Sequence, residues 1–135
     1  MTAGRIDTNI ILRFLTDEPP EQADRASRFV AAIQRGDEEV ILEEVVVAEV
    51  IWTLRSFYTM TRAEIASLLL RFLAMDHILS SDKEALRVAI VLFAQRNIDF
   101  ADAILVAKAL QSDNPVIYSF DRDFDRIPGV IRREP

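Results

Sequence analysis

Hydrophobic positions along the chain form two patterns, short apolar runs and longer stretches in which apolar residues recur every three or four positions. The short runs predict strands and the longer stretches predict helices, because a helix places every third or fourth residue on one face. The predicted strands are 5–6, 40–42, 77–79 and 116–118, with 77–79 at a sheet edge. The predicted helices are 10–15, 20–35, 43–58, 61–75, 81–97 and 98–110. Strands that alternate with helices favour an α/β fold with a mainly parallel sheet.

Several predicted helices have recognisable boundary residues. Gly36 follows the last apolar position of the second helix, and glycine commonly ends a helix at such a position. Thr61 and Glu64 have the spacing of a capping box, which Ser81 and Glu84 repeat before the next helix. These residues predict where two of the later helices begin.

Composition narrows the class of protein. The 135 residues, of which 50% are hydrophobic, suit a single domain that spans residues 1–135 and has a genuine core. The absence of cysteine excludes disulfides and thiolate metal sites and favours a reducing cytoplasm. Charge interrupts the apolar runs before they reach a membrane-spanning length, so no membrane segment is expected. A net charge of −6 argues against binding of nucleic acid by bulk electrostatics alone.

Acidic side chains stand where predicted strands end or predicted helices begin. Asp7 follows the first strand, and Asp121 follows the last one. Asp99 and Asp102 are three apart at the start of an otherwise apolar helix, and this spacing directs both side chains the same way. The ends of parallel strands meet at one edge of a sheet, where ligands gather. Helix caps, or charges that favour a helix N-terminus, explain each acid taken alone equally well.

Glu49 is the one ionisable residue between positions 45 and 54. Its neighbours one helical turn away include Val45 and Trp52, so we expect its carboxylate to point toward the interior. An isolated buried carboxylate is unfavourable unless it is protonated, paired or bound to a metal. A salt bridge to Arg13 or Arg55 is the alternative to a metal site.

Other charged residues are expected to be ordinary surface groups. Asp123 and Asp125 are interpreted as surface charges or caps, and His77, the single histidine, as a structural or surface residue. Some basic residues could lie at the rim of an acidic pocket, although a solvated surface is the simpler interpretation for each of them: Arg13, Arg55, Lys108, Arg122 and Arg126.

Four segments match one known family in order and spacing. They are IDTNIILRFL (6–15), VVVAEVIWTL (45–54), DFADAILVAKA (99–109) and YSFDRDFDRIPGV (118–130). Together they resemble the PIN-domain ribonucleases, most closely the VapC-type toxins of prokaryotic toxin-antitoxin pairs. The resemblance covers nearly the whole chain and implies a three-layer α/β/α sandwich around a mainly parallel central sheet. One departure is the segment MTAGRI, which is less apolar than the family's first strand.

The resemblance also implies a pocket of acids that binds Mg²⁺ or Mn²⁺. The residues that match the family's catalytic and metal-binding acids are Asp7, Glu49, Asp102 and Asp121. Asp99 matches an additional acid that can bind the metal directly or through water. Asn9 and Ser119 match polar positions that brace the pocket, with serine where threonine is common.

The implied activity is that of a metal-dependent endoribonuclease that hydrolyses RNA phosphodiester bonds. Carboxylates select hard cations, and such an ion lowers the pKa of a bound water and neutralises charge on the leaving oxygen. The resemblance further implies a homodimer and a cognate antitoxin protein as partner. Two other classes of function fit the acids: a non-catalytic module that binds metal or accepts a phosphoryl group, and an interaction module whose acids are helix caps.

Overall fold

The computed structural model describes residues 3–135, so the first two residues of the MTAGRI segment lie outside the described part. The chain forms two compact units, Met1–Lys83 and Glu84–Pro135, and each is described by itself. Both units contain parallel strands joined by helices. The predicted α/β fold with a mainly parallel sheet is therefore confirmed.

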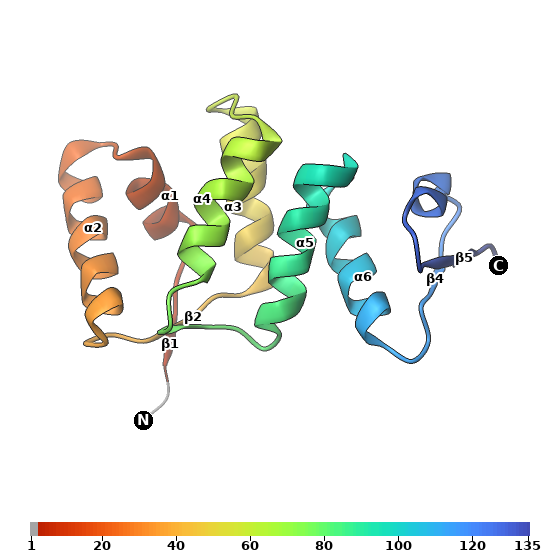
Figure 1. Ribbon diagram of the computed structural model, residues 1–135. Helices are drawn as coiled ribbons and strands as arrows, with labels where there is room; N and C mark the ends of the chain where they lie inside the picture. The colour runs from red at the N-terminus through yellow and green to blue at the C-terminus, as the bar shows by residue number, and fades with distance from the viewer. Residues whose placement is uncertain (1–2) are drawn as a thin grey trace. The chain divides into compact units, whose positions relative to one another are not determined.

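The first unit contains a three-stranded sheet in the order β1-β2-β3. The strands are β1 (Gly4–Arg5), β2 (Val40–Ile41) and β3 (Ile78–Leu79). Both pairings are parallel, with Gly4 opposite Val40 and Val40 opposite Ile78. The strand predicted for the sheet edge, β3, lies at an edge. The strands β1 and β2 lie at one end of the neighbouring helices (Figure 1).

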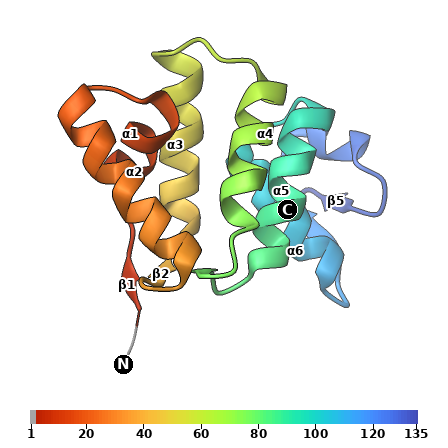
Figure 2. The same ribbon diagram turned by 60° about the vertical axis from the view of Figure 1, so that its left-hand side comes forward.

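Four helices pack in the first unit, as Figure 2 shows from a second direction. They are α1 (Thr8–Thr16), α2 (Pro20–Arg35), α3 (Glu44–Ser56) and α4 (Arg62–Leu73). Their apolar faces form a core in which Ile33, Leu54 and Ile65 have no exposed surface. The Phe14 and Phe72 rings, 6.1 Å apart between centroids, join α1 to α4.

Local signals placed two helix boundaries correctly. Thr61 accepts a hydrogen bond from the Glu64 backbone, and the Glu64 side chain accepts one from the Thr61 backbone, which completes the predicted capping box of α4. Gly36 ends α2 with a φ of 82°, a conformation that favours glycine. A Cβ at Gly36 would lie 2.9 Å from Nε2 of His77, so the imidazole closely approaches this turn.

The second unit contains two helices and a two-stranded parallel sheet. The helices are α5 (Lys83–Arg96), whose first residue closes the first unit, and α6 (Phe100–Gln111). The strand β4 (Val116–Tyr118) leads through a short 3₁₀ helix, η1 (Arg122–Arg126), to β5 (Ile131–Arg133). The strand β4 has the predicted bounds, whereas β5 was not predicted. No helix within residues 3–135 is long and apolar enough to cross a membrane.

Candidate functional site

Asp7 lies at the junction between β1 and α1. The backbone N–H of Ile6 donates to the carbonyl of Ile41 over 3.1 Å, which holds this junction against β2. Asp7 occupies the N-cap position of α1 with an extended backbone, but its side chain makes no capping hydrogen bond. Its carboxylate is exposed. The interpretation of Asp7 as a helix cap thus lacks the bond that would support it.

Glu49, on α3, is linked to the start of α1 by a neighbour of Asp7. The Thr8 hydroxyl donates to Oε2 of Glu49 over 3.2 Å. Thr8 is 7% exposed and is the one buried polar residue within residues 3–135. The bond places the Glu49 carboxylate beside the residue that follows Asp7. The side chain of Arg13, one of the two proposed ion-pair partners of Glu49, instead donates to Gln22.

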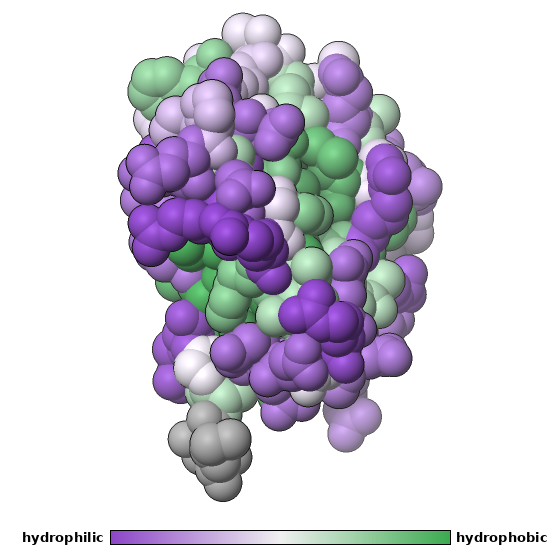
Figure 3. Space-filling model, turned by 90° about the vertical axis from the view of Figure 1, so that its left-hand side faces the viewer, coloured by the Kyte–Doolittle hydropathy of each residue, from purple (hydrophilic) through white to green (hydrophobic). Residues whose placement is uncertain are grey.

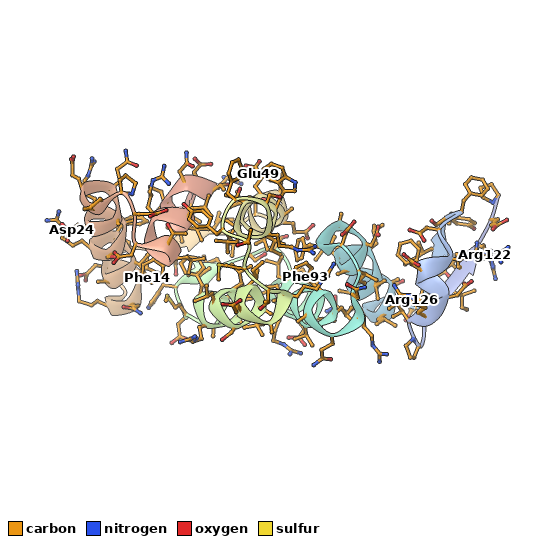
Figure 4. All side chains as sticks on the ribbon, turned by 90° about the horizontal axis from the view of Figure 1, so that it is seen from above. Phe14, Asp24, Glu49, Phe93, Arg122 and Arg126 are labelled. Carbon is orange, nitrogen blue, oxygen red and sulfur yellow. The ribbon has the colours of Figure 1, made fainter. Side chains whose placement is uncertain are left out.

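The prediction that Glu49 points toward the interior is wrong, because its side chain is exposed. The face of α3 that packs into the core consists of Val47, Val50, Ile51 and Leu54. Glu49 shares the other face with Val45 and Trp52, which are 64% and 63% exposed. Figure 4 shows Glu49 on the side of α3 that faces away from α4. The apolar neighbours that suggested burial are themselves at the surface.

The second unit brings several carboxylates together at the start of α6. Asp99 occupies the N-cap position, again without a side-chain capping bond, and Asp102 follows in the first turn. Burial raises the pKa of Asp102, and the charges of Asp99, Asp121 and Asp123 raise it further. Asp102 is half-buried, whereas Asp99 is exposed. The predicted acids Asp99, Asp102 and Asp121 therefore influence one another electrostatically.

Asp121 is positioned by hydrogen bonds at the end of β4. Its backbone N–H donates to the Ser119 hydroxyl over 2.9 Å, and its Oδ1 accepts from the Asp123 backbone over 2.9 Å. The Ser119 backbone N–H in turn donates to the carbonyl of Arg133 over 3.0 Å, which holds Ser119 next to the end of β5. The predicted supporting residue Ser119 thus orients the backbone of Asp121.

Arginine side chains lie beside Asp123 and Asp125, the two acids that were interpreted as surface charges or caps. Arg132 lies 3.0 Å from Asp125, and Arg126 lies 3.8 Å from Asp123, in agreement with their interpretation as surface charges. The ion pairs described within each unit involve none of the predicted site acids; these acids are Asp7, Glu49, Asp99, Asp102 and Asp121. Like charges without a counter-cation favour the binding of an external cation.

The donor atoms of these acids fit a hard divalent cation, because all of them are carboxylate oxygens. Two acids, Asp7 and Glu49, belong to the first unit, and Asp99, Asp102 and Asp121 belong to the second. In the described part of the chain, no three or more Asp, Glu or His side chains are grouped closely enough to hold a metal ion. The fit thus rests on the chemistry of the donors and on the raised pKa of Asp102.

Two residues near the first-unit acids were missed as functional candidates. No functional role was predicted for Thr8 from the sequence, but its place three and four residues before Ile11 and Leu12 puts it on the buried face of α1. No functional role was predicted for Arg25 either, yet it lines a cavity with Asn9 and Arg13. The burial of Thr8 could have been predicted from helical spacing. The place of Arg25 at the cavity follows only from the packing of α1 against α2.

The chain is similar to a known protein family and to a known protein. A family model described as PIN domain matches residues 6–130. A VapC ribonuclease from Aquifex aeolicus (strain VF5) is 25% identical to the chain over 122 residues, which cover 90% of the chain and 90% of that relative. The region matched by the family model contains all the acids described above, from Asp7 to Asp121.

Proposed function

The chain belongs to the PIN domain family, and from this membership we propose that it is a metal-dependent endoribonuclease. Its similarity to a VapC ribonuclease over 90% of both chains supports RNA as the substrate. We further propose that residues 1–135 act as one nuclease domain, because the family match spans both compact units.

The observation that best supports this activity is the effect of neighbouring carboxylate charges on Asp102. Burial and the charges of Asp99, Asp121 and Asp123 raise its pKa, so its ionised form is destabilised in the metal-free protein. A divalent cation would remove this repulsion, since its charge opposes that of the carboxylates. Phosphodiester hydrolysis is the reaction for which nucleases use such ions.

Each proposed site residue has a role that follows from its position. The residues that would hold Mg²⁺ or Mn²⁺ are Asp7, Glu49, Asp99, Asp102 and Asp121. When bound, the ion supplies an acidified water and neutralises charge on the leaving oxygen. Thr8 holds the Glu49 carboxylate in place, and Ser119 orients the backbone of Asp121. Asn9, exposed two residues after Asp7, is available to contact the RNA strand.

The biological role that we propose is that of the toxin in a type II toxin-antitoxin system, acting in the cytoplasm. It rests on the similarity to the VapC ribonuclease. The expected partners are a cognate antitoxin protein and a second copy of the chain. Light scattering after size-exclusion chromatography tests for the homodimer, and co-purification with the product of a small adjacent gene tests for the antitoxin.

The activity is tested by incubating a panel of purified RNAs with wild-type protein and with Asp102→Asn, in Mg²⁺, in Mn²⁺ and in EDTA. We expect cleavage by the wild type with either metal, none in EDTA, and a loss of at least about 100-fold in the variant, since the substitution removes a proposed ligand of the ion that would stabilise charge at the reacting phosphate. Asp113→Asn is a matched control, because Asp113 is an exposed aspartate outside the acid cluster. Full cleavage by Asp102→Asn would refute the proposed site.

A further inference from the structure

A cavity of about 480 Å³ lies between α1 and α2, in the first unit. Its volume falls within the range of small-molecule and cofactor sites in proteins. The lining residues, which come from these two helices, are Asn9, Ile10, Arg13, Gln22, Arg25, Ala26 and Phe29. Figure 3, which faces this side of the molecule, shows strongly hydrophilic side chains beside exposed apolar surface.

The two arginines of the cavity lack acidic partners. Nε of Arg13 donates to Oε1 of Gln22 over 2.8 Å, which fixes the plane of its guanidinium group. Neither Arg13 nor Arg25 forms an ion pair within residues 3–135. By contrast, Arg28 on the same helix lies 2.8 Å from Asp24, and Arg35 lies 2.9 Å from Asp37.

Unpaired guanidinium groups are notable in this chain because acids outnumber bases and the net charge is −6. The carboxylates that neutralise Arg28 and Arg35 have no counterpart beside Arg13 and Arg25. Guanidinium groups bind phosphate oxygens through paired hydrogen bonds, and a fixed plane lowers the entropy cost of doing so. The cavity therefore presents positive charge in the form that suits a phosphate.

The remaining lining of the cavity is apolar. Phe29 is half-buried and Ala26 is buried, so both are held by the packing of α2. Exposed bases of single-stranded RNA stack on aromatic rings and on guanidinium planes. A nucleotide thus finds a charged group for its phosphate and an aromatic surface for its base in one cavity.

The cavity is also close to Asp7 along the chain. Asn9, which follows Asp7 by two residues, is part of the lining. Arg13 lies further along the same helix, about 9 Å from Asp7 along the axis at 1.5 Å per residue. A strand held at this cavity would thus pass the N-terminus of α1.

We propose that the cavity between α1 and α2 binds a nucleotide of the RNA strand next to the one that is cleaved. Arg13 and Arg25 bind its phosphate, and Phe29 stacks against its base. The inference rests on the proposed nuclease function for the identity of the strand. It assigns Arg13, Arg25 and Phe29 to substrate positioning and gives them no part in the chemical step.

The test measures binding of RNA separately from its cleavage. A fluorescent single-stranded RNA is titrated with full-length protein in EDTA, and anisotropy is followed at several KCl concentrations. We expect Arg13→Gln and Arg25→Gln each to weaken binding about tenfold. Each should also reduce the slope of log affinity against log salt by about 0.7, the value for one lost contact to a single-stranded phosphate.

Matched variants distinguish binding at this cavity from a general effect of positive charge on RNA affinity. Arg28→Gln removes the same charge from the same helix, but Arg28 is paired with Asp24 and lies outside the cavity lining, so binding should change little. Arg13→Lys keeps the charge but loses the planar fork and should bind between wild type and Arg13→Gln. If Arg13→Gln perturbs the contact with Gln22 and lowers the Tm, Arg25→Gln still tests the site.

The outcomes distinguish this inference from the proposed function. If cleavage depends on metal and requires Asp102 but RNA affinity is unchanged in Arg13→Gln and Arg25→Gln, the proposed nucleotide site is wrong and the proposed nuclease function stands. Weakened RNA binding in both variants supports the cavity even if no cleavage is found.

Parallel titrations identify the ligand of the cavity. If the two substitutions weaken binding of AMP or of polyglutamate but leave RNA affinity unchanged, the cavity takes a free nucleotide or an acidic protein segment instead. An equal loss in Arg28→Gln, or no measurable binding of RNA by the wild type, also overturns the proposal.

Discussion

The hydroxyl of Thr8 donates a 3.2 Å hydrogen bond to the carboxylate of Glu49, and so joins the first residue of α1 to the outer face of α3. Thr8 is buried and Glu49 is exposed, so the bond ties a surface carboxylate to a fixed point in the fold. A glutamate side chain has several rotatable bonds, and one without such a partner samples many positions. The position of the Glu49 carboxylate therefore depends on the uncharged side chain of Thr8.

We expect Thr8→Val to lower RNA cleavage about tenfold without unfolding the protein. Valine has nearly the same shape but cannot donate, and a hydrogen bond to a charged group contributes about 1.5 kcal/mol. Initial cleavage rates at saturating metal measure the effect. Thr8→Ser keeps the hydroxyl and should retain most of the activity. Equal rates for wild type and Thr8→Val would show that Glu49 needs no support from Thr8.

The raised pKa of Asp102 makes stability depend on pH. Because the pKa is higher in the folded protein, ionisation of Asp102 opposes folding; this cost is complete above the folded pKa and disappears below the ordinary value of 3.8. We expect Asp102→Asn to raise the Tm of metal-free protein at neutral pH and to raise it less near about pH 4. Calorimetry in EDTA measures both values. An equal gain at the two pH values would contradict this account.

After burial, the charge of Asp99 is the largest influence on Asp102. Asp99→Asn removes that charge and should lower the pKa of Asp102 toward its ordinary value. Carbon-13 NMR of the side-chain carboxyl groups, recorded through an acid titration, gives the pKa directly. Asp113→Asn should leave it unchanged. A pKa that does not move in Asp99→Asn would mean that the charge of Asp99 does not perturb Asp102.

Added Mn²⁺ or Mg²⁺ should raise the Tm of the wild type. An ion at 100 times its Kd stabilises the folded state by about 2.7 kcal/mol, which corresponds to roughly 8–11 °C for a chain of this length. Asp7→Asn removes a proposed ligand and should abolish most of the rise. Asp76→Asn, at an exposed aspartate between α4 and β3, should preserve it. Thermal melts followed by circular dichroism test this, and an undiminished rise in Asp7→Asn would exclude Asp7 as a ligand.

Stability and activity should separate at the capping box of α4. Thr61→Ala removes the bond to the Glu64 backbone and should cost about 1 kcal/mol, or roughly 3–4 °C in Tm. RNA cleavage well below the Tm should not change, because the cap takes no part in the proposed site. A large loss of cleavage in this variant would mean that α4 has a functional role beyond packing.

Local patterns predicted the elements whose signals lie within a few residues. The α4 cap, the end of α2 at Gly36 and the bounds of β4 all follow from side chains next to the boundary. The strand β5 has no such signal, because Ile131 and Arg133 are exposed and only Arg132 between them is half-buried. Its pairing with β4 depends on contacts that are distant in sequence.

For the candidate site, the sequence indicated which residue types to consider more reliably than it indicated the surroundings of their side chains. The spacing of Asp99 and Asp102 predicted that their side chains point the same way, and in the structure the charge of Asp99 raises the pKa of Asp102. The environment of Glu49 was predicted wrongly, because hydrophobicity of Val45 and Trp52 does not reveal which face of α3 meets the core. The membership of Glu49 and Asp7 in a metal site stays a prediction.

The brevity of the strands in the first unit has a consequence for how that unit opens. Each pairing of β1, β2 and β3 joins only two residues per strand, whereas α3 and α4 contribute the fully buried Leu54 and Ile65. Amide protons of α3 and α4 should therefore exchange with deuterium most slowly, and those of the strands earlier. In this unit the sheet sets the direction of the chain at Asp7, and the helices resist its unfolding.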